Sequence, residues 1–160
     1  MKQVESEKYN IAWFKLSECV ARGEKERALG VYKLLSHSIG DAAFVQQLEG
    51  DLLLAFEDEH AVQKYLAAAN LYKKNQRFVE AAAVYEHLVT LQPDVDDHVV
   101  ALVMLYKILN FPDKIETHLT HSVTRFSESD NAIKLNAFLV KLQEVSKEGY
   151  TFAKKLISGK

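Results

Sequence analysis

The sequence predicts an all-α fold of about eight antiparallel helices, for three reasons. Only six of the 160 residues are Gly and two are Pro, the residue types that interrupt helices most strongly. Apolar residues recur at helical spacing, and no segment alternates apolar and polar residues over a useful length. A unit of two helices also repeats along the chain. Because the connections are short, neighbouring helices must be antiparallel, either in a closed bundle or in an open row of hairpins.

The first half of the chain contains four of these helices, each bounded by a turn signal. Gly23 supplies the left-handed residue that ends the first helix. Asp41 is the expected N-cap of the third helix, and residues 57–58 form the turn into the fourth. The predicted helices are residues 11–20, 24–35, 42–56 and 59–75.

The second half contains four more helices and a short tail. Pro93 stops the fifth helix, and Asp94 is expected to cap the sixth. Pro112 suits the first turn of the seventh helix. Gly149 is expected to interrupt the eighth helix, which leaves residues 150–157 as a short, loosely held piece. The predicted helices are residues 77–91, 94–109, 112–126 and 129–148.

An internal repeat favours the open row over the closed bundle. Residues 24–32 and 57–65 each combine an acidic turn, an Ala and, one helical turn later, a Tyr, at an offset of 33 residues. A third copy follows 20 residues after the second, and a weaker fourth copy follows 34 residues after the third. A period of about 33–34 residues with two helices per unit indicates a helical solenoid. The corresponding pairs are Ala28 and Tyr32, Ala61 and Tyr65, Ala81 and Tyr85, and Ile115 and Leu119.

On these residues the sequence resembles the tetratricopeptide repeat family. The best unit, residues 65–93, carries aromatic and small residues on its first helix, Ala and then an aromatic on its second, and a closing proline. Leu88 and Ala69 depart from the commonest residues of the family. Residues 13–35 match less completely, and residues 99–126 match mainly in length. The matching residues of the best unit are Tyr65, Ala68, Ala69, Tyr72, Ala81, Tyr85 and Pro93.

The resemblance covers roughly residues 8–126 and implies a right-handed α-α superhelix. We expect one domain over residues 1–160, with a capping helix and tail in residues 127–160, because the last apolar face of a solenoid needs a cover with a polar outer side. The copies leave the repeat phase open near Gly40. The first copy makes the first helix a leading helix, whereas the best copy gives that role to the fourth. The phase matters because leading helices line the concave surface in this family.

The resemblance implies that the concave face binds a segment of another protein, as an extended peptide or a helix. In the frame of the best unit, the fourth and sixth helices line this groove, with Asn to hydrogen-bond a peptide backbone and Lys to pair with a carboxylate. Some members of the family grip a C-terminal carboxylate with Lys and Asn, but here only Asn70 matches that set. The expected groove residues are Gln63, Leu66, Asn70, Lys73, Val100, Met104 and Lys107. In the other frame Phe14, Glu18, Gln47 and Asp51 line the groove, and its acidic side chains favour a basic partner.

Composition and charge favour a soluble protein of the cytoplasm. The net charge of −2 gives no reason to expect nucleic acid as a partner. The longest apolar run, residues 99–106, is too short to insert into a membrane, and the first residues lack the apolar run of a secretory signal. Cys19 is the single cysteine, so it forms no intrachain disulfide, and its place on the apolar stripe of the first helix predicts a buried thiol.

No linear motif indicates catalysis, a cofactor or a metal. The chain has no Gly-rich phosphate loop, no nucleophile elbow and no carboxylate pair that stands apart from surface charge. His118 and His121 are three residues apart, whereas metal-binding histidines on a helix are usually four apart with a third ligand nearby. Asp94, Asp96 and Asp97 are better explained by the N-terminus of a helix. We therefore expect no enzyme, no cofactor and no metal site.

The sequence leaves three classes of function open. The first is a non-catalytic module, a monomer or weak homodimer, that binds a peptide or helix of a partner protein in its groove. The second is a small chaperone for a secreted or membrane-inserting substrate, which would dimerise through Ile11, Trp13 and Phe14. The third is an enzyme or ligand-binding helical bundle.

Overall fold

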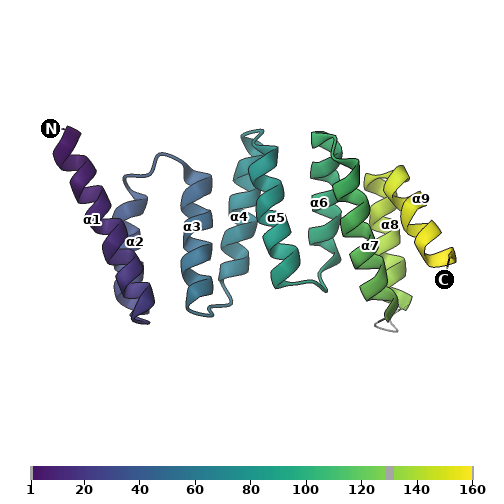
Figure 1. The fold of residues 1–160 in the computed structure, drawn as a ribbon, viewed down its shortest axis with the longest axis horizontal. Helices are drawn as coiled ribbons and strands as arrows, with labels where there is room; N and C mark the ends of the chain where they lie inside the picture. Colours follow the sequence, from purple (N-terminus) through teal and green to yellow (C-terminus); the bar gives the residue numbers. More distant parts are fainter. Residues whose placement is uncertain (1, 129–131, 160) are drawn as a thin grey trace. The chain divides into compact units, whose positions relative to one another are not determined.

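The computed structural model describes the backbone of residues 2–128 and 132–159, and the side chains of residues 10–127 and 132–159. All regular secondary structure in this part of the chain is helical, as predicted (Figure 1). The helices are α1 (Lys2–Ala21), α2 (Lys25–Ser36), α3 (Ala42–Ala55), α4 (Ala61–Lys74), α5 (Phe78–Leu91), α6 (Asp96–Leu109), α7 (Pro112–Glu128), α8 (Ala132–Val145) and α9 (Lys147–Ser158). Most contacts between helices join neighbours in sequence, the arrangement of an all-α repeat solenoid.

The chain divides into two compact units, Met1–Leu71 and Tyr72–Lys160. The boundary falls inside α4, so the first unit contains most of that helix and the second unit contains its last turn. We describe each unit by itself.

In the first unit, small residues let helices approach closely. Ala28 on α2 is fully buried, where α2 packs against α1. Gly50 on α3 lies under the ring of Tyr65 on α4, and a Cβ atom at Gly50 would come within 3.0 Å of that ring. A side chain at this position would require the Tyr65 ring to shift by a few tenths of an ångström, so Gly50 lets the ring approach α3 closely. The core of the unit consists of Leu16, Cys19, Ala28, Tyr32, Leu35 and Leu52.

In the second unit, the last four helices form two layers. Helix α6 packs beside α8, α7 packs beside α9, and contacts between α6 and α7 and between α8 and α9 join the layers. Aromatic and aliphatic side chains fill the space between them; the rings of Phe126 and Phe138 lie 5.2 Å apart. The core consists of Val99, Val103, Leu119, Val123, Phe126, Phe138, Leu139, Leu142 and Ala153.

The Ala and Tyr pairs of the sequence repeat occupy equivalent buried positions. Every Ala of the first three copies is at most 2% exposed, and every Tyr is at most 8% exposed. Each tyrosine hydroxyl meets a polar group of an adjacent helix. Tyr32 donates to the carbonyl of Val45 (3.0 Å), Tyr65 donates to Asp51 (2.7 Å), and Tyr85 accepts from Lys73 (3.3 Å). The repeat therefore reflects one packing role, with the ring in the core and the hydroxyl at its edge.

Most predicted boundaries are confirmed, but the first helix begins at Lys2 instead of residue 11, and one predicted cap is wrong. Gly23 has a φ of 71°, Asp41 accepts hydrogen bonds from the amides of Ala43 and Phe44, and Pro112 is the first residue of α7. Asp94 is not the N-cap of α6. That position belongs to Val95, whose side chain makes no capping bond, because α6 begins at Asp96.

The predicted break at Gly149 is also wrong. The chain breaks at Ser146, whose hydroxyl accepts a hydrogen bond from the amide of Gly149 (3.0 Å), so Gly149 lies in the first turn of α9. The tail is not loosely held, since Ala153 is fully buried and Phe152 packs against the core. The cover of the second unit is therefore a helical hairpin, α8 and α9, instead of one long helix. The polar opening predicted for the eighth helix falls partly on residues 129–131, outside the described residues.

Candidate functional site

Three of the predicted groove residues lie on α4 in the first unit. Gln63 and Asn70 are exposed and Leu66 is half-buried. Asn70 also lines an open hollow, together with Ile39 and Gly40 of the α2–α3 connection. The amide of Asn70 is thus accessible from a concave part of the first unit.

The other four predicted residues lie in the second unit. Val100 is half-buried and packs against the core of that unit. The remaining three, Lys73, Met104 and Lys107, differ in their surroundings. The ammonium of Lys73 lies 5.3 Å from the centre of the Tyr85 ring and bonds to its hydroxyl, which directs Lys73 toward α5. Met104 is 54% exposed, and Lys107 is exposed on the same helix, α6. Of the three, Met104 and Lys107 are the ones that a partner segment reaches most freely.

The alternative face of the first unit combines an apolar side chain with acids that already have partners. Phe14 is 71% exposed. Glu18 pairs with Arg22 at 2.5 Å, and Asp51 accepts the hydrogen bond from Tyr65. Gln47 is half-buried. Arg22 offsets the charge of Glu18, whereas the neutral hydroxyl of Tyr65 leaves the charge of Asp51 in place, so this face is less acidic than the sequence suggests only at Glu18.

Helices α6 and α8, which pack side by side, each present exposed apolar side chains. The core of this unit lies between the two layers. Side chains of α6 and α8 that point away from the core are therefore exposed on the outer face of their layer. Met104 on α6 and Val140 on α8 (59% exposed) are such side chains. Ile133, seven residues before Val140 and so two helical turns away, is 82% exposed. Exposed apolar side chains therefore lie on both helices of this layer, Met104 on α6 and Ile133 and Val140 on α8.

Polar contacts fix α6 and α8 against each other near both ends of α6. At the N-terminal end, the ammonium of Lys141 lies 2.6 Å from the Asp97 carboxylate and 3.1 Å from that of Asp96. At the C-terminal end, Lys107 donates to the carbonyl of Val145 (3.3 Å). Hydrogen bonds from Lys141 to Asp97 and Asp96 raise the pKa of the lysine, so its charge is retained. The apolar face thus lies on two helices in a fixed register.

A cavity of about 240 Å³ opens beside Lys107, between the α6–α7 turn and the start of α9. Its walls are mainly apolar, and charged side chains lie at its edge. Asn110 shapes the turn, because it adopts the left-handed conformation with a φ of 57°. The residues that define the cavity are Phe111, Pro112, Ile115 and Phe152, with Lys107 and Glu148 at the edge.

The carboxylate of Glu148 is held at this cavity by weak contacts. It lies 3.8 Å from the ammonium of Lys107 and 3.3 Å from the hydroxyl of Ser146. The side chain of Glu148 is 80% exposed. Its own backbone amide, the charge of Lys107 and the Ser146 hydroxyl lower the pKa of the carboxyl, so it is an anion at neutral pH.

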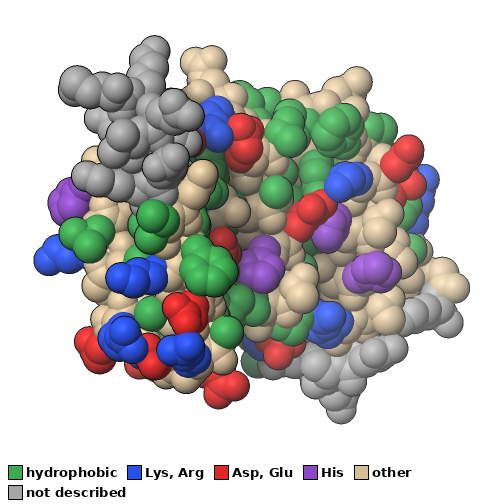
Figure 2. All heavy atoms as spheres, turned by 60° about the vertical axis from the view of Figure 1, so that its left-hand side comes forward, with side chains coloured by type: hydrophobic (Ala, Val, Ile, Leu, Met, Phe, Trp, Pro, Cys, Tyr) green, Lys and Arg blue, Asp and Glu red, His purple; other side chains and the backbone are tan. Residues whose placement is uncertain are grey.

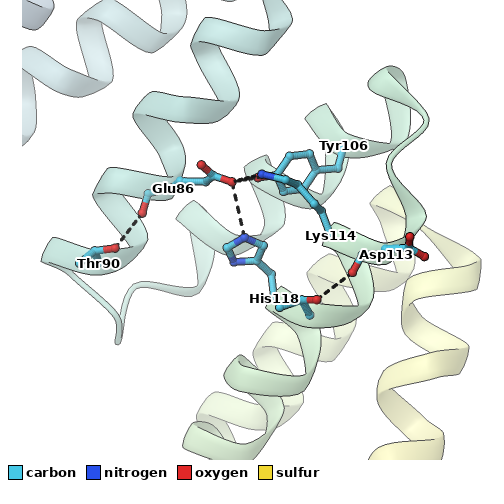
Figure 3. Close-up of polar contacts among 7 residues, drawn as sticks. Glu86, Thr90, Tyr106, Asp113, Lys114 and His118 are labelled. Atoms are coloured by element: carbon cyan, nitrogen blue, oxygen red, sulfur yellow. Dashed lines mark hydrogen bonds and ion pairs between the residues drawn. The ribbon is translucent and has the colours of Figure 1, made fainter.

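A second polar cluster joins α5, α6 and α7 around Glu86 (Figure 3). The Glu86 carboxylate accepts hydrogen bonds from Tyr106 and from Lys114 (2.8 Å), and His118 lies 3.9 Å away. The rings of Tyr106 and His118 stack with centres 5.7 Å apart. Burial raises the pKa of Glu86, but the bonds from Lys114 and Tyr106 outweigh it and the net pKa is lowered. Burial lowers the pKa of His118 more strongly than Glu86 raises it.

This cluster is best explained as a structural link between three helices. Each polar group that it contains has a partner within it, and the phenol of Tyr106 has a pKa raised by burial and by its bond to Glu86. His118, considered as a metal ligand in the sequence, faces Glu86 instead of His121. Among the residues whose side chains are described, no group of three or more His, Cys, Asp or Glu is placed to hold a metal ion.

Charges of both signs are interspersed on the face of the molecule drawn in Figure 2. Several are paired, such as Lys25 with Asp58 (2.6 Å) and Lys64 with Glu49 (3.0 Å). These pairs neutralise part of the lysine-free stretch between Leu34 and Gln63, which by its sequence alone is strongly acidic. None of the helices in the described part of the chain has the length and apolarity that a membrane span requires.

The residues that create the cavity were not predicted from the sequence. Pro112 was expected only in the first turn of a helix, Phe111 was given no role beyond the turn before it, and Phe152 was expected only in a loose tail. A signal was present in Phe111, an aromatic residue in a tight turn, where polar residues are more usual. Helix α9, which packs against that turn to form the cavity, was predicted with the wrong start because the break was expected at Gly149.

Comparison of the chain with protein families, curated proteins and solved structures returned no match.

Proposed function

We propose that this chain is a non-catalytic protein-interaction module of the tetratricopeptide-like kind, acting in the cytoplasm, which binds a peptide or helix of a partner protein. The observation that carries the proposal is the exposure of Met104 and Val140 on two helices packed side by side. Scattered single apolar residues are normal on a protein surface, but exposed apolar residues on two adjacent helices are typical of an interaction surface. We call Met104, Ile133 and Val140 the apolar strip.

Two further features support this function. Lys107 and Lys141 hold α6 and α8 in register, so little order has to be gained when a partner binds. Asn70 and Lys73 are three residues apart on α4, where the family resemblance puts groove residues. Successive helices of a repeat array expose such residues in series, which suits an extended segment or an amphipathic helix.

The test is capture of a partner from a lysate of the source cells by the intact chain and by charge-reversed variants. We expect Lys73→Glu combined with Lys107→Glu to weaken the captured partner's binding at least about tenfold, with little change in melting temperature. Met104→Asp should weaken it similarly, because it puts a charge on the apolar strip. Lys33→Glu combined with Lys74→Glu is the control, since both lysines are exposed and lie outside the predicted groove. If the groove variants bind the partner as tightly as the control does, the groove lies elsewhere.

A small dimeric chaperone is the second candidate, favoured by α1. Ile11 and Phe14 are 60% and 71% exposed there, whereas Trp13 is half-buried and packs against the core of the first unit. A chaperone of this kind would cover Ile11 and Phe14 with a second copy. Sedimentation of the wild type and of Phe14→Asp separates the two candidates. A monomeric wild type at tens of micromolar would count against the chaperone, and a dimer that Phe14→Asp dissociates would favour it.

A further inference from the structure

The cavity beside Lys107 is large enough for a ring-sized side chain and open to solvent. An interior void of about 150 Å³ already holds a benzene ring, and this cavity measures about 240 Å³. Phe111 and Phe152 contribute aromatic walls, and Phe111 is 44% exposed, so a side chain can enter from outside. A bulky apolar group placed here would bury its surface against four apolar side chains of the cavity, which is favourable.

The charges at the edge of the cavity favour an acidic neighbour. A shallow depression next to the cavity shares Glu116, Glu148 and Phe152 with it and adds Lys147 and Lys155. Together with Lys107, three lysines face two glutamates. Of these groups, the Lys107 ammonium already has a carboxylate beside it, that of Glu148.

The ion pair between Lys107 and Glu148 shows that Lys107 can pair with a carboxylate and that this carboxylate is only weakly held. Their separation of 3.8 Å is long for an ion pair, and the Glu148 side chain is 80% exposed. Exposed pairs of this kind contribute little to stability. A carboxylate from a bound segment could therefore replace that of Glu148 without a large loss.

We propose that the cavity binds a bulky apolar side chain of the partner segment, and that a carboxylate next to this side chain pairs with Lys107 in place of Glu148. The proposal rests on the proposed function, since it names the chemistry of the partner that the module takes. The apolar side chain fixes the position of the segment, and the carboxylate selects acidic segments over basic ones. Lys107 at the edge of the cavity lies on α6 three residues after the exposed Met104, so the two features are close on one helix.

The experiment uses the full chain and a fluorescein-labelled synthetic peptide with an Asp-Phe-Asp centre in a Ser and Ala background. The peptide is acetylated and amidated, so that it offers no terminal carboxylate. Fluorescence anisotropy gives the affinity, and NMR shifts of the amides of Asn110 and Gly149 report on the cavity. We expect binding that weakens at least about tenfold when Phe is replaced by Ala or both Asp by Lys in the peptide. Phe111→Ala and Lys107→Glu in the protein should weaken binding of the original peptide by a similar factor.

Glu148→Gln is the most informative variant, because it is expected to tighten binding, whereas a variant that merely disturbs the fold would weaken it. Removal of the competing carboxylate should tighten binding of the acidic peptide about threefold or more. Glu144→Gln on α8 is the matched control, since Glu144 is exposed but does not line the cavity, and it should leave the affinity unchanged. Melting temperatures of all variants identify any that lose their fold.

Each remaining outcome overturns the proposal. Affinity that Glu148→Gln leaves unchanged or lowers would show that Lys107 takes no carboxylate from the segment. Shifts confined to residues around Met104 and Val140 would exclude the cavity but leave the proposed function standing. Absence of any NMR shift at millimolar peptide would exclude this ligand chemistry. The proposed function would then be tested separately by the lysate capture with Met104→Asp. Self-association that Phe111→Ala abolishes would identify a second copy of the chain as the occupant.

Discussion

The two compact units share the buried Ala and Tyr pairs of the repeat but differ in the other residues that fill their cores. The first unit relies on close helix approach at Ala28 and Gly50 and on tyrosines whose hydroxyls reach polar groups of neighbouring helices. The second unit relies on large side chains, such as Phe126 and Phe138, between two layers of helices. In the second unit, helices two apart in sequence also pack together.

This difference bears on where a partner can bind with least reorganisation. Packing between α6 and α8 and between α7 and α9 holds the outer face of the second unit from behind. The exposed side chains Met104 and Val140 lie on that supported layer. Among the described side chains of the first unit, the most exposed aromatic one is Phe14, on α1. The comparison favours the second unit as the location of the proposed binding surface.

The largest effect should come from a cavity in the core of the second unit. Leu142 is fully buried between the layers, so Leu142→Ala should reduce the free energy of unfolding by about 2–5 kcal/mol. Amide hydrogen exchange should show the loss of protection on α7, α8 and α9. Val140→Ala on the same helix is the control and should cost less than about 0.5 kcal/mol. Leu35→Ala makes the equivalent change in the first unit, and a loss there larger than for Leu142→Ala would break the comparison.

A smaller effect should come from overpacking at the repeated alanine. Ala81 on α5 is fully buried, and Ala81→Leu should cost about 1–3 kcal/mol, because the helix must move away from its neighbour. Denaturant unfolding measures the loss. Ala83→Leu, on the exposed side of the same helix, should cost little. Ala28→Leu should cost a similar amount in the first unit, and a negligible effect at either Ala28 or Ala81 would show that the repeat does not mark one packing role.

The smallest effect concerns pH and distinguishes the units by their ionisable groups. Burial lowers the pKa of His98 and of His118 below the ordinary value of 6.5, despite the acids beside them. The folded second unit then binds fewer protons than its unfolded chain, so its stability should fall as the pH drops below about 6.5. In the first unit, the Lys25 ammonium and the His60 amide hold the pKa of Asp58 below 3.8, so the stability from Asp58 is lost only at much lower pH.

Amide exchange at about pH 7 and about pH 5, corrected for the intrinsic rate, measures this difference unit by unit. The second unit should lose protection over this interval, and His118→Gln should reduce the loss because that side chain takes up no proton. His121→Gln on the exposed side of α7 is the control. Equal losses in both units, or a loss that His118→Gln does not change, would contradict the role given to the buried histidines.

Several features of the fold could be predicted because they depend on neighbours in sequence. Helical periodicity and the scarcity of Gly and Pro predicted the all-α architecture, and Gly23, Asp41 and Pro112 marked boundaries that the structure confirms. The predicted N-cap at Asp94 and the predicted helix break at Gly149 were wrong for the same reason. Each residue type often occupies a helix end, but here Val95 and Ser146 stand at those ends. Local propensity ranks candidates for a cap, and packing chooses among them.

The candidate site could be predicted only in part. The repeat placed Met104 and Lys107 on one helix, and both are exposed there. The helix that packs beside them, α8, and its exposed Val140 could not be predicted, because no repeat copy covers it. Asp96 and Asp97 were interpreted as charges at the N-terminus of a helix, yet they also bind Lys141, more than forty residues away in sequence.

The sequence by itself determined that this protein is a series of amphipathic helices with a recurring Ala and Tyr pair in the core. Those properties follow from spacings within a single helix, which the order of residues fixes directly. Only the tertiary structure decided that α9 covers the second unit and that Phe111 and Phe152 enclose a cavity beside Lys107. Lys107, Phe111 and Phe152 lie up to 45 positions apart in the sequence. They meet because the apolar side chains between α7, α8 and α9 must be buried, and a pattern within one helix cannot predict that packing.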